Sequence, residues 1–159
     1  MSDLPGFGPA PNASSRPYAA PLLTNRATAV LAEALQTSRR RNREEVGTED
    51  LLLALLSEGG VVATTLQALG VDAGALAERV RASAPASAAR SQTTVPSLAQ
   101  VRKALDLAEG EARQMRQALG PEHLLLGLLA EQEGLGPELL REAGLSLEAT
   151  RRQLEQAAG

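Results

Sequence analysis

The sequence predicts an all-α protein made of two pseudo-symmetric four-helix repeats, with eight helices in total. The first indication is an internal repeat, because GTEDLLLALL at 47–56 recurs as GPEHLLLGLL at 120–129. The second is the distribution of aromatic residues, since Phe7 and Tyr18 are the only two in the chain. A core of Leu, Val and Ala suits helices that approach one another closely. The third is that no segment shows the apolar–polar alternation typical of a strand.

The first repeat is expected to span 22–83. Its first helix is predicted by apolar residues at three- and four-residue spacing and ends in the basic run RRRNR at 39–43. The second begins at Gly47, the third ends at Gly70 in a left-handed cap, and the fourth has Asp72 as its N-cap. The apolar positions of the first helix are Ala27, Val30, Leu31, Ala34 and Leu35.

The second repeat is expected to span 96–158 and to follow the same plan. Gly120 corresponds to Gly47 and Gly144 to Gly70, and Ser146 takes the capping position of Asp72. A linker of small residues over 84–95 joins the repeats. Residues 1–21 contain five of the nine prolines and no helical or strand period, so they are predicted to form a disordered tail.

The helix starts of the two repeats carry the same motif, Gly-x-Glu followed by leucines. Pro121 suits a first helical position, where its missing N–H costs nothing. Glu49, Asp50 and Glu122 complement the positive end of the helix dipole. Two buried leucine stripes are expected, made of Leu51, Leu52, Leu55 and Leu56 and of Leu124, Leu125, Leu128 and Leu129.

Several functional classes are not indicated. There is no GxxxxGK[ST] phosphate loop, so we expect no ATP binding. The chain has no cysteine and one histidine, His123, which we expect to be a solvated helix residue without a metal or cofactor. The net charge is −3, and RRRNR fits a helix C-terminus better than a nucleic-acid contact. No apolar run is long enough for a membrane span. We therefore expect a cytoplasmic protein that is not an enzyme and takes no nucleic-acid or membrane partner.

Two longer segments resemble the N-terminal domain of the Clp/Hsp100 unfoldases, above all the ClpC and ClpA types. They are LTNRATAVLAEA at 23–34 and VGTEDLLLALLSEGGVVATTLQALGV at 46–71. The resemblance covers both repeats and implies a module that binds adaptors and substrate proteins for the unfoldase. It also implies recognition of phosphoarginine, through the Glu of the motif and nearby polar groups. The matching residues here are Thr24, Arg26, Thr48, Glu49 and Glu122.

The second repeat departs from that pattern, because Pro121 replaces the motif threonine and SLAQV replaces its T-x-R-A start. We therefore expect phosphoarginine to prefer the first repeat. The chain resembles a stand-alone N-domain that modulates Clp-dependent proteolysis by binding Clp subunits, adaptors or clients. The alternative is a regulatory or structural protein that reuses the fold for a partner outside proteolysis. A further alternative is that the tail, with Phe7 and Tyr18, docks in a groove of the domain.

Overall fold

The computed structural model of the chain describes residues 22–40, 45–89 and 97–158. Within these residues it contains eight α-helices and no named strand, which confirms the predicted fold class. The helices are α2 (Asn25–Arg40), α3 (Thr48–Glu58), α4 (Gly60–Ala68), α5 (Ala73–Ala89), α6 (Ser97–Met115), α7 (Pro121–Ala130), α8 (Leu135–Glu142) and α9 (Leu147–Ala158).

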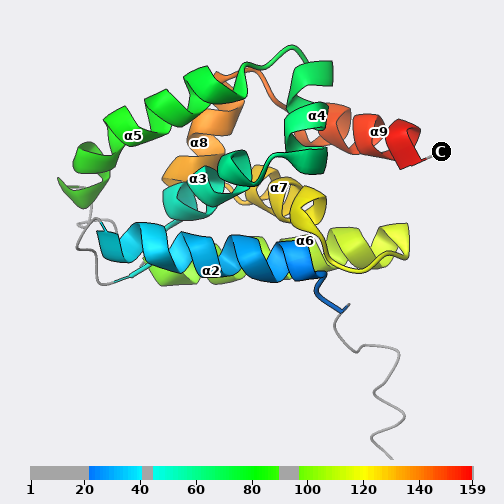
Figure 1. Cartoon of the computed structure of the whole chain (residues 1–159), viewed down its shortest axis with the longest axis horizontal. Helices are drawn as coiled ribbons and strands as arrows, with labels where there is room; N and C mark the ends of the chain where they lie inside the picture. Colours follow the sequence, from blue (N-terminus) through cyan, green and yellow to red (C-terminus); the bar gives the residue numbers. More distant parts are fainter. Residues whose placement is uncertain (1–21, 41–44, 90–96, 159) are drawn as a thin grey trace, which may run out of the picture.

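The two motif helices, α3 and α7, lie in the middle of the molecule. In Figure 1, α2 and α6 lie on one side of them and α4, α5, α8 and α9 on the other. The two helices contact each other, and α3 also contacts α8 while α7 contacts α4. The halves are thus interleaved around one core of leucine, valine and alanine rather than standing apart.

The leucine stripes predicted for the motif helices are confirmed, since all members are buried except Leu56, which is partly buried. The stripe predicted for α2 is confirmed only in part. Ala27, Val30 and Ala34 are buried, but Leu35 is 48% exposed. A helix needs only its inner arc to face the core, and Leu35 lies beyond the edge of that arc.

The helix ends follow the predicted chemistry in both repeats. Gly70 and Gly144 have φ of 78° and 96°, the left-handed conformation that a residue without Cβ adopts most readily. Asp72 accepts a hydrogen bond from the N–H of Ala75, and Ser146 accepts one from Ala149. Each side chain therefore caps the last helix of its repeat, as the sequence predicts.

One helix is longer than expected. We predicted the fourth helix to end at Ser83, whereas α5 continues to Ala89 through part of the segment assigned to the linker. Alanine has the highest helix propensity, and the alanine-rich composition extends the helix in spite of Pro85.

Each repeat is joined to the other at its first helix. Leu23 and Leu119 form an isolated parallel bridge, in which the Leu119 N–H donates to the Leu22 carbonyl and the Thr24 N–H to the Leu119 carbonyl. On the other side, the N–H of Leu98 in the first turn of α6 donates to the Glu45 carboxylate at 3.3 Å. The start of each repeat thus rests on the loop that precedes the motif helix of the other repeat.

The predicted tail over 1–21 and the second half of the predicted linker lie outside the described residues. Of the basic run at 39–43, Arg39 and Arg40 are described and occupy the last turn of α2, as expected. Within the described part of the chain, no single helix is long and apolar enough to cross a membrane. The consecutive helices α3 and α4 reach that length together but are bent by 92°.

Candidate functional site

The first motif starts α3 with a carboxylate cap. The N–H of Gly47 donates to Oδ2 of Asp50 at 2.8 Å, in a buried position. Asp50 is three residues into the helix, so its side chain reaches back to the cap residue as in a capping box. The carboxylate thereby satisfies one of the N–H groups that the helix cannot bond internally.

The second motif starts α7 with an imidazole in the same place. The N–H of Gly120 donates to Nδ1 of His123 at 2.9 Å, so the proton of the neutral ring is on Nε2, which donates to Oε1 of Gln117 at 2.9 Å. The prediction that His123 is a solvated helix residue is wrong, because the side chain is fully buried. Burial lowers the pKa of His123 below its ordinary value, against the opposing effects of Glu122 and Glu111.

The glutamate of each motif lies close to its glycine. A Cβ at Gly47 would lie 2.5 Å from Oε1 of Glu49, and a Cβ at Gly120 would collide with the Glu122 carboxylate in the same way. The glutamate side chain therefore folds back over the glycine, beside the positive end of the helix.

In the first repeat, the motif is covered by the second repeat. Thr48 is fully buried, and its hydroxyl accepts a hydrogen bond at 3.0 Å from the N–H of Gly136 in the first turn of α8. A Cβ at Gly136 would lie 2.7 Å from the Thr48 carbonyl oxygen, and a Cβ at Gly134 would also collide with Thr48. The next residue, Glu49, is also buried, with 4% of its surface exposed.

In the second repeat, the equivalent place is open. Pro121 stands where the first motif has Thr48 and offers no hydroxyl to an approaching helix start. Glu122 is partly exposed and lines a cavity of about 190 Å³ between the starts of α4 and α7 and the ends of α6 and α9. The cavity is lined by Val61, Met115, Gln117, Glu122, Leu154 and Ala157.

A second, larger cavity of about 440 Å³ adjoins the first and shares Met115 and Gln117 with it. It is also lined by Arg151 and Glu155 of α9. Arg151 is held by a bidentate pair with Glu111, with nitrogen–oxygen distances of 2.9 and 2.7 Å. This pairing neutralises the one cation in the two linings, so Glu122 and Glu155 give the groove an acidic character. We call the two cavities together the α6–α9 groove.

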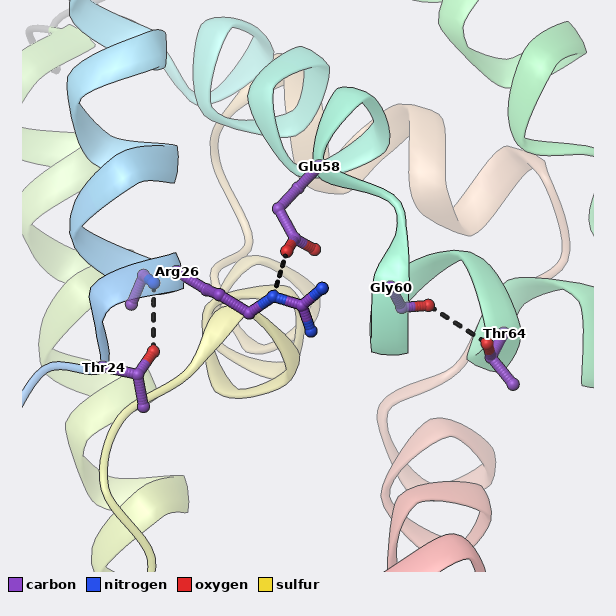
Figure 2. A network of polar contacts seen from close by, with 6 residues as sticks. Thr24, Arg26, Glu58, Gly60 and Thr64 are labelled. Carbon is purple, nitrogen blue, oxygen red and sulfur yellow. Dashed lines mark hydrogen bonds and ion pairs between the residues drawn. The ribbon is translucent and has the colours of Figure 1, made fainter.

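Thr24 and Arg26, which the sequence assigns to the first motif, lie elsewhere (Figure 2). Thr24 caps α2 by accepting the Ala27 N–H at 3.0 Å, and Nε of Arg26 pairs with Oε2 of Glu58 at 2.9 Å. Glu58 ends α3, about 13 Å from Glu49 at roughly 1.5 Å of rise per residue. The four residues assigned to the first repeat, Thr24, Arg26, Thr48 and Glu49, therefore do not lie together in one site.

Instead, the fold brings Thr24 and Arg26 to the second motif. The Thr24 N–H bonds to Leu119, three residues before Glu122, and the Arg26 guanidinium lies against Gly60 at the start of α4. The next residue, Val61, lines the cavity with Glu122. Arg26 is 62% exposed. One cation and one carboxylate thus lie at neighbouring places where α2, α4 and α7 meet.

Sequence reasoning missed Glu58, whose Oε1 is buried without a hydrogen-bond partner. Its counterpart in the second repeat is Glu131, whose two carboxylate oxygens accept the N–H groups of Glu133 and Gly134 at 3.0 and 2.8 Å. The loop after Glu58 is shorter, since α4 begins at Gly60, and it offers no such donors. The different loop lengths in the two repeats were the signal available in the sequence.

No cluster of three or more metal-ligating side chains exists among the described residues. The second motif presents a partly exposed carboxylate, an amide, an apolar lining and a nearby guanidinium. Such a set can bind a planar cation through the carboxylate and an anion through Arg26.

The family model described as the Clp repeat (R) N-terminal domain matches residues 22–118 and 99–159. The chain is 36% identical over 138 residues to the negative regulator of genetic competence ClpC/MecB of Bacillus subtilis. It is 34% identical over 138 residues to the chaperone protein ClpB of Oceanobacillus iheyensis. Each alignment covers 86% of this chain and 17% of the relative, so the chain spans about a sixth of the length of these proteins.

Solved structures show the same fold. The Hsp104 N-terminal domain of Candida albicans superposes with a TM-score of 0.66 at 18% identity, covering 87% of this chain and 92% of that one. The N-terminal domain of the caseinolytic protease associated chaperone ClpD of Arabidopsis thaliana gives 0.60 at 20% identity, covering 86% and 95%. The similarity thus extends over nearly the whole of each of these domains.

Proposed function

Because this chain belongs to the Clp repeat N-terminal domain family, we propose that it is a protein-binding module for substrates and adaptors of Clp unfoldases. In this proposal the chain modulates Clp-dependent proteolysis in the cytoplasm by binding alone, without an ATPase of its own and without catalysis. The observation that carries it is the open second motif, where Glu122 lines a cavity beside exposed apolar and amide groups.

The ligand chemistry that fits this place is a guanidinium next to an anion, as in a phosphoarginine side chain. Glu122 supplies a carboxylate for the guanidinium, to which arginine binds in a forked geometry. The N–H groups at the start of α4 supply positive charge for a phosphoryl group. Arg26 adds hydrogen-bond donors from the part of its guanidinium that Glu58, its partner through Nε, does not occupy. The proposed site therefore uses Arg26 and Glu122 across the two repeats, with Thr24 holding the start of α2 beside them. Thr48 and Glu49 are buried at the start of α3.

The experiment that tests the function is site-specific crosslinking in cells. A photo-crosslinking amino acid replaces Gln117, which is exposed on the rim of the cavity, or Glu78, which is exposed on α5 and serves as the matched control. We expect position 117 to capture Clp unfoldase subunits, adaptors or proteins that carry phosphoarginine, and position 78 to capture none of them. Capture of a single partner unrelated to proteolysis would support the alternative of a regulatory or structural protein instead.

A further inference from the structure

Gln117 stands where the two cavities of the α6–α9 groove meet. Its side chain is exposed and lines both cavities, and Met115 is the other residue that they share. The smaller cavity contains Glu122 and has a volume of about 190 Å³, enough for one side chain, since a cavity of about 150 Å³ holds benzene. The larger has a volume of about 440 Å³. A ligand that extends from one cavity into the other therefore passes Gln117.

The orientation of the Gln117 amide follows from a chain of hydrogen bonds that starts at the backbone. The N–H of Gly120 can only donate, so Nδ1 of His123, at 2.9 Å, accepts. Burial lowers the pKa of His123, so the ring is neutral at neutral pH and carries its proton on Nε2. Nε2 then donates to the amide oxygen of Gln117 at 2.9 Å. The oxygen is held at the buried ring, and the NH₂ group is the polar end of this exposed side chain on the groove side.

The backbone that carries Gln117 is also fixed. α6 ends at Met115, and Arg116 has a φ of 56°, the only positive φ outside glycine among the described residues. The N–H of Arg116 donates to the Arg113 carbonyl and the N–H of Gln117 to the Ala112 carbonyl, which is the pattern of a Schellman cap. Glycine is the usual residue at this place, and a residue held in an unfavoured conformation beside a cavity points to function.

Gln117 and Glu122 offer opposite halves of a hydrogen-bonding pair in the smaller cavity. The Glu122 carboxylate accepts, and the Gln117 NH₂ group donates. A ligand that binds both presents a cation or another donor to Glu122 and an oxygen acceptor to Gln117. Because Gln117 also borders the larger cavity, that oxygen lies where the ligand leaves the smaller cavity. In a peptide whose side chain enters the smaller cavity, the group at this point is a main-chain carbonyl.

We infer that Gln117 is a specificity-determining residue of the groove, whose amide NH₂ group, oriented by His123, donates to a main-chain carbonyl of a bound peptide with a basic side chain at Glu122. His123 is a positioning residue, because it acts through Gln117. The ligand is then an extended peptide that occupies both cavities and not a free side-chain group. This inference rests on the proposed function, which places the ligand in this groove.

The variant Gln117→Met tests the contact, because it removes the donor without changing the charge. The probes are a phosphoarginine peptide and phosphoagmatine, which has the phosphorylated guanidinium but no main-chain carbonyl. Loss of one neutral hydrogen bond should weaken binding of the peptide by about twofold to tenfold and leave the affinity for phosphoagmatine unchanged. Gln114→Met is the matched control, since Gln114 is exposed and lines only the larger cavity, and it should bind both probes as wild type does.

Unchanged binding of the peptide by Gln117→Met would overturn the inference and leave the proposed function in place. An equal loss for phosphoagmatine would assign the NH₂ group to the phosphoryl oxygens and overturn the main-chain contact. No binding of either probe by wild type would reject the proposed function, and the contact with it.

The positioning role of His123 is tested by a double-mutant cycle. His123→Asp keeps an acceptor for the Gly120 N–H, as Asp50 does at Gly47, but it has no donor for Gln117. It should weaken binding of the peptide by the same factor as Gln117→Met, and the double variant should bind no more weakly than Gln117→Met alone. Losses that add in the double variant would mean that His123 acts only by holding the start of α7.

The orientation itself is read in the free protein. Nitrogen NMR of the ring at neutral pH identifies which nitrogen of His123 carries the proton. We expect Nε2. A proton on Nδ1 would overturn the inference whether or not a peptide binds.

Discussion

The hydroxyl of Thr48 accepts the backbone N–H of Gly136 at 3.0 Å, across 88 residues of sequence, and so joins the two repeats. The contact buries the first motif under α8. The second motif has Pro121 in the same place and remains open at Glu122. The internal symmetry of the chain is therefore broken at the two motifs: Glu49 is 4% exposed, whereas Glu122 is partly exposed.

Loss of the hydrogen bond between Thr48 and Gly136 should lower the free energy of unfolding. Thr48→Val removes the acceptor and leaves the buried Gly136 N–H without a partner, which destabilises by about 1–3 kcal/mol. Urea denaturation measures the change. Thr64→Val on α4 is the control, because the Thr64 hydroxyl donates to the Gly60 carbonyl from an exposed position. A loss for Thr48→Val no larger than for the control would mean that this hydrogen bond contributes little.

The imidazole cap of α7 should make stability depend on pH. Burial lowers the pKa of His123 in the folded protein, so between its folded and unfolded pKa values the unfolded chain binds more protons. Stability is then fully present above the unfolded value of about 6.5 and decreases as the pH falls below it, by at most about 1.4 kcal/mol per pH unit. Protonation also converts Nδ1 into a donor, which cannot accept the Gly120 N–H.

The variant His123→Asp separates this effect from other titrating groups, since Asp50 caps α3 from the same position. Urea denaturation at pH 7.5 and 5.5 should show a smaller loss of stability on acidification for the variant than for wild type. An equal loss in both proteins would show that His123 does not titrate over this range.

Two glycines should respond to alanine in opposite directions. Gly127 in α7 packs on α6, where an added Cβ would lie 2.8 Å from Cβ of Ala108 and collide with the Ala104 carbonyl. Gly127→Ala should destabilise by about 1–3 kcal/mol through overpacking. Gly110 has open space at its Cβ position, so Gly110→Ala should stabilise by up to about 1 kcal/mol through helix propensity. Thermal denaturation of both variants checks the prediction, which a stabilising Gly127→Ala would contradict.

Local chemistry predicted the helices well. The caps at Asp72 and Ser146 and the left-handed glycines Gly70 and Gly144 depend on a few neighbouring residues, and the sequence shows all of them. The role of His123 was missed, although the repeat alignment places it opposite Asp50 in the capping position. Treating a lone histidine as a surface residue ignored that correspondence.

Long-range packing could not be predicted in the same way. The motif around Thr48 suggests a hydroxyl that binds a ligand. In the structure, α8 packs against Thr48, and the hydroxyl instead accepts the Gly136 N–H. Arg26 follows the first-repeat pattern, yet the bridge at Leu23 and Leu119 carries it to the second motif. Both contacts depend on how the repeats interleave, and neither the spacing nor the composition of one repeat contains that information.

The central claim is that the second motif, and not the first, offers the ligand-binding carboxylate. The most direct measurement is a titration of a phosphoarginine peptide into wild type, Glu122→Gln and Glu49→Gln, with the unmodified arginine peptide as the control ligand. Loss of one charge-assisted hydrogen bond, about 1.5–3 kcal/mol, should weaken binding roughly tenfold to a hundredfold in Glu122→Gln. Glu49→Gln should bind as wild type does, because Glu49 is buried. A larger loss in Glu49→Gln than in Glu122→Gln, or unchanged binding in Glu122→Gln, would contradict the account.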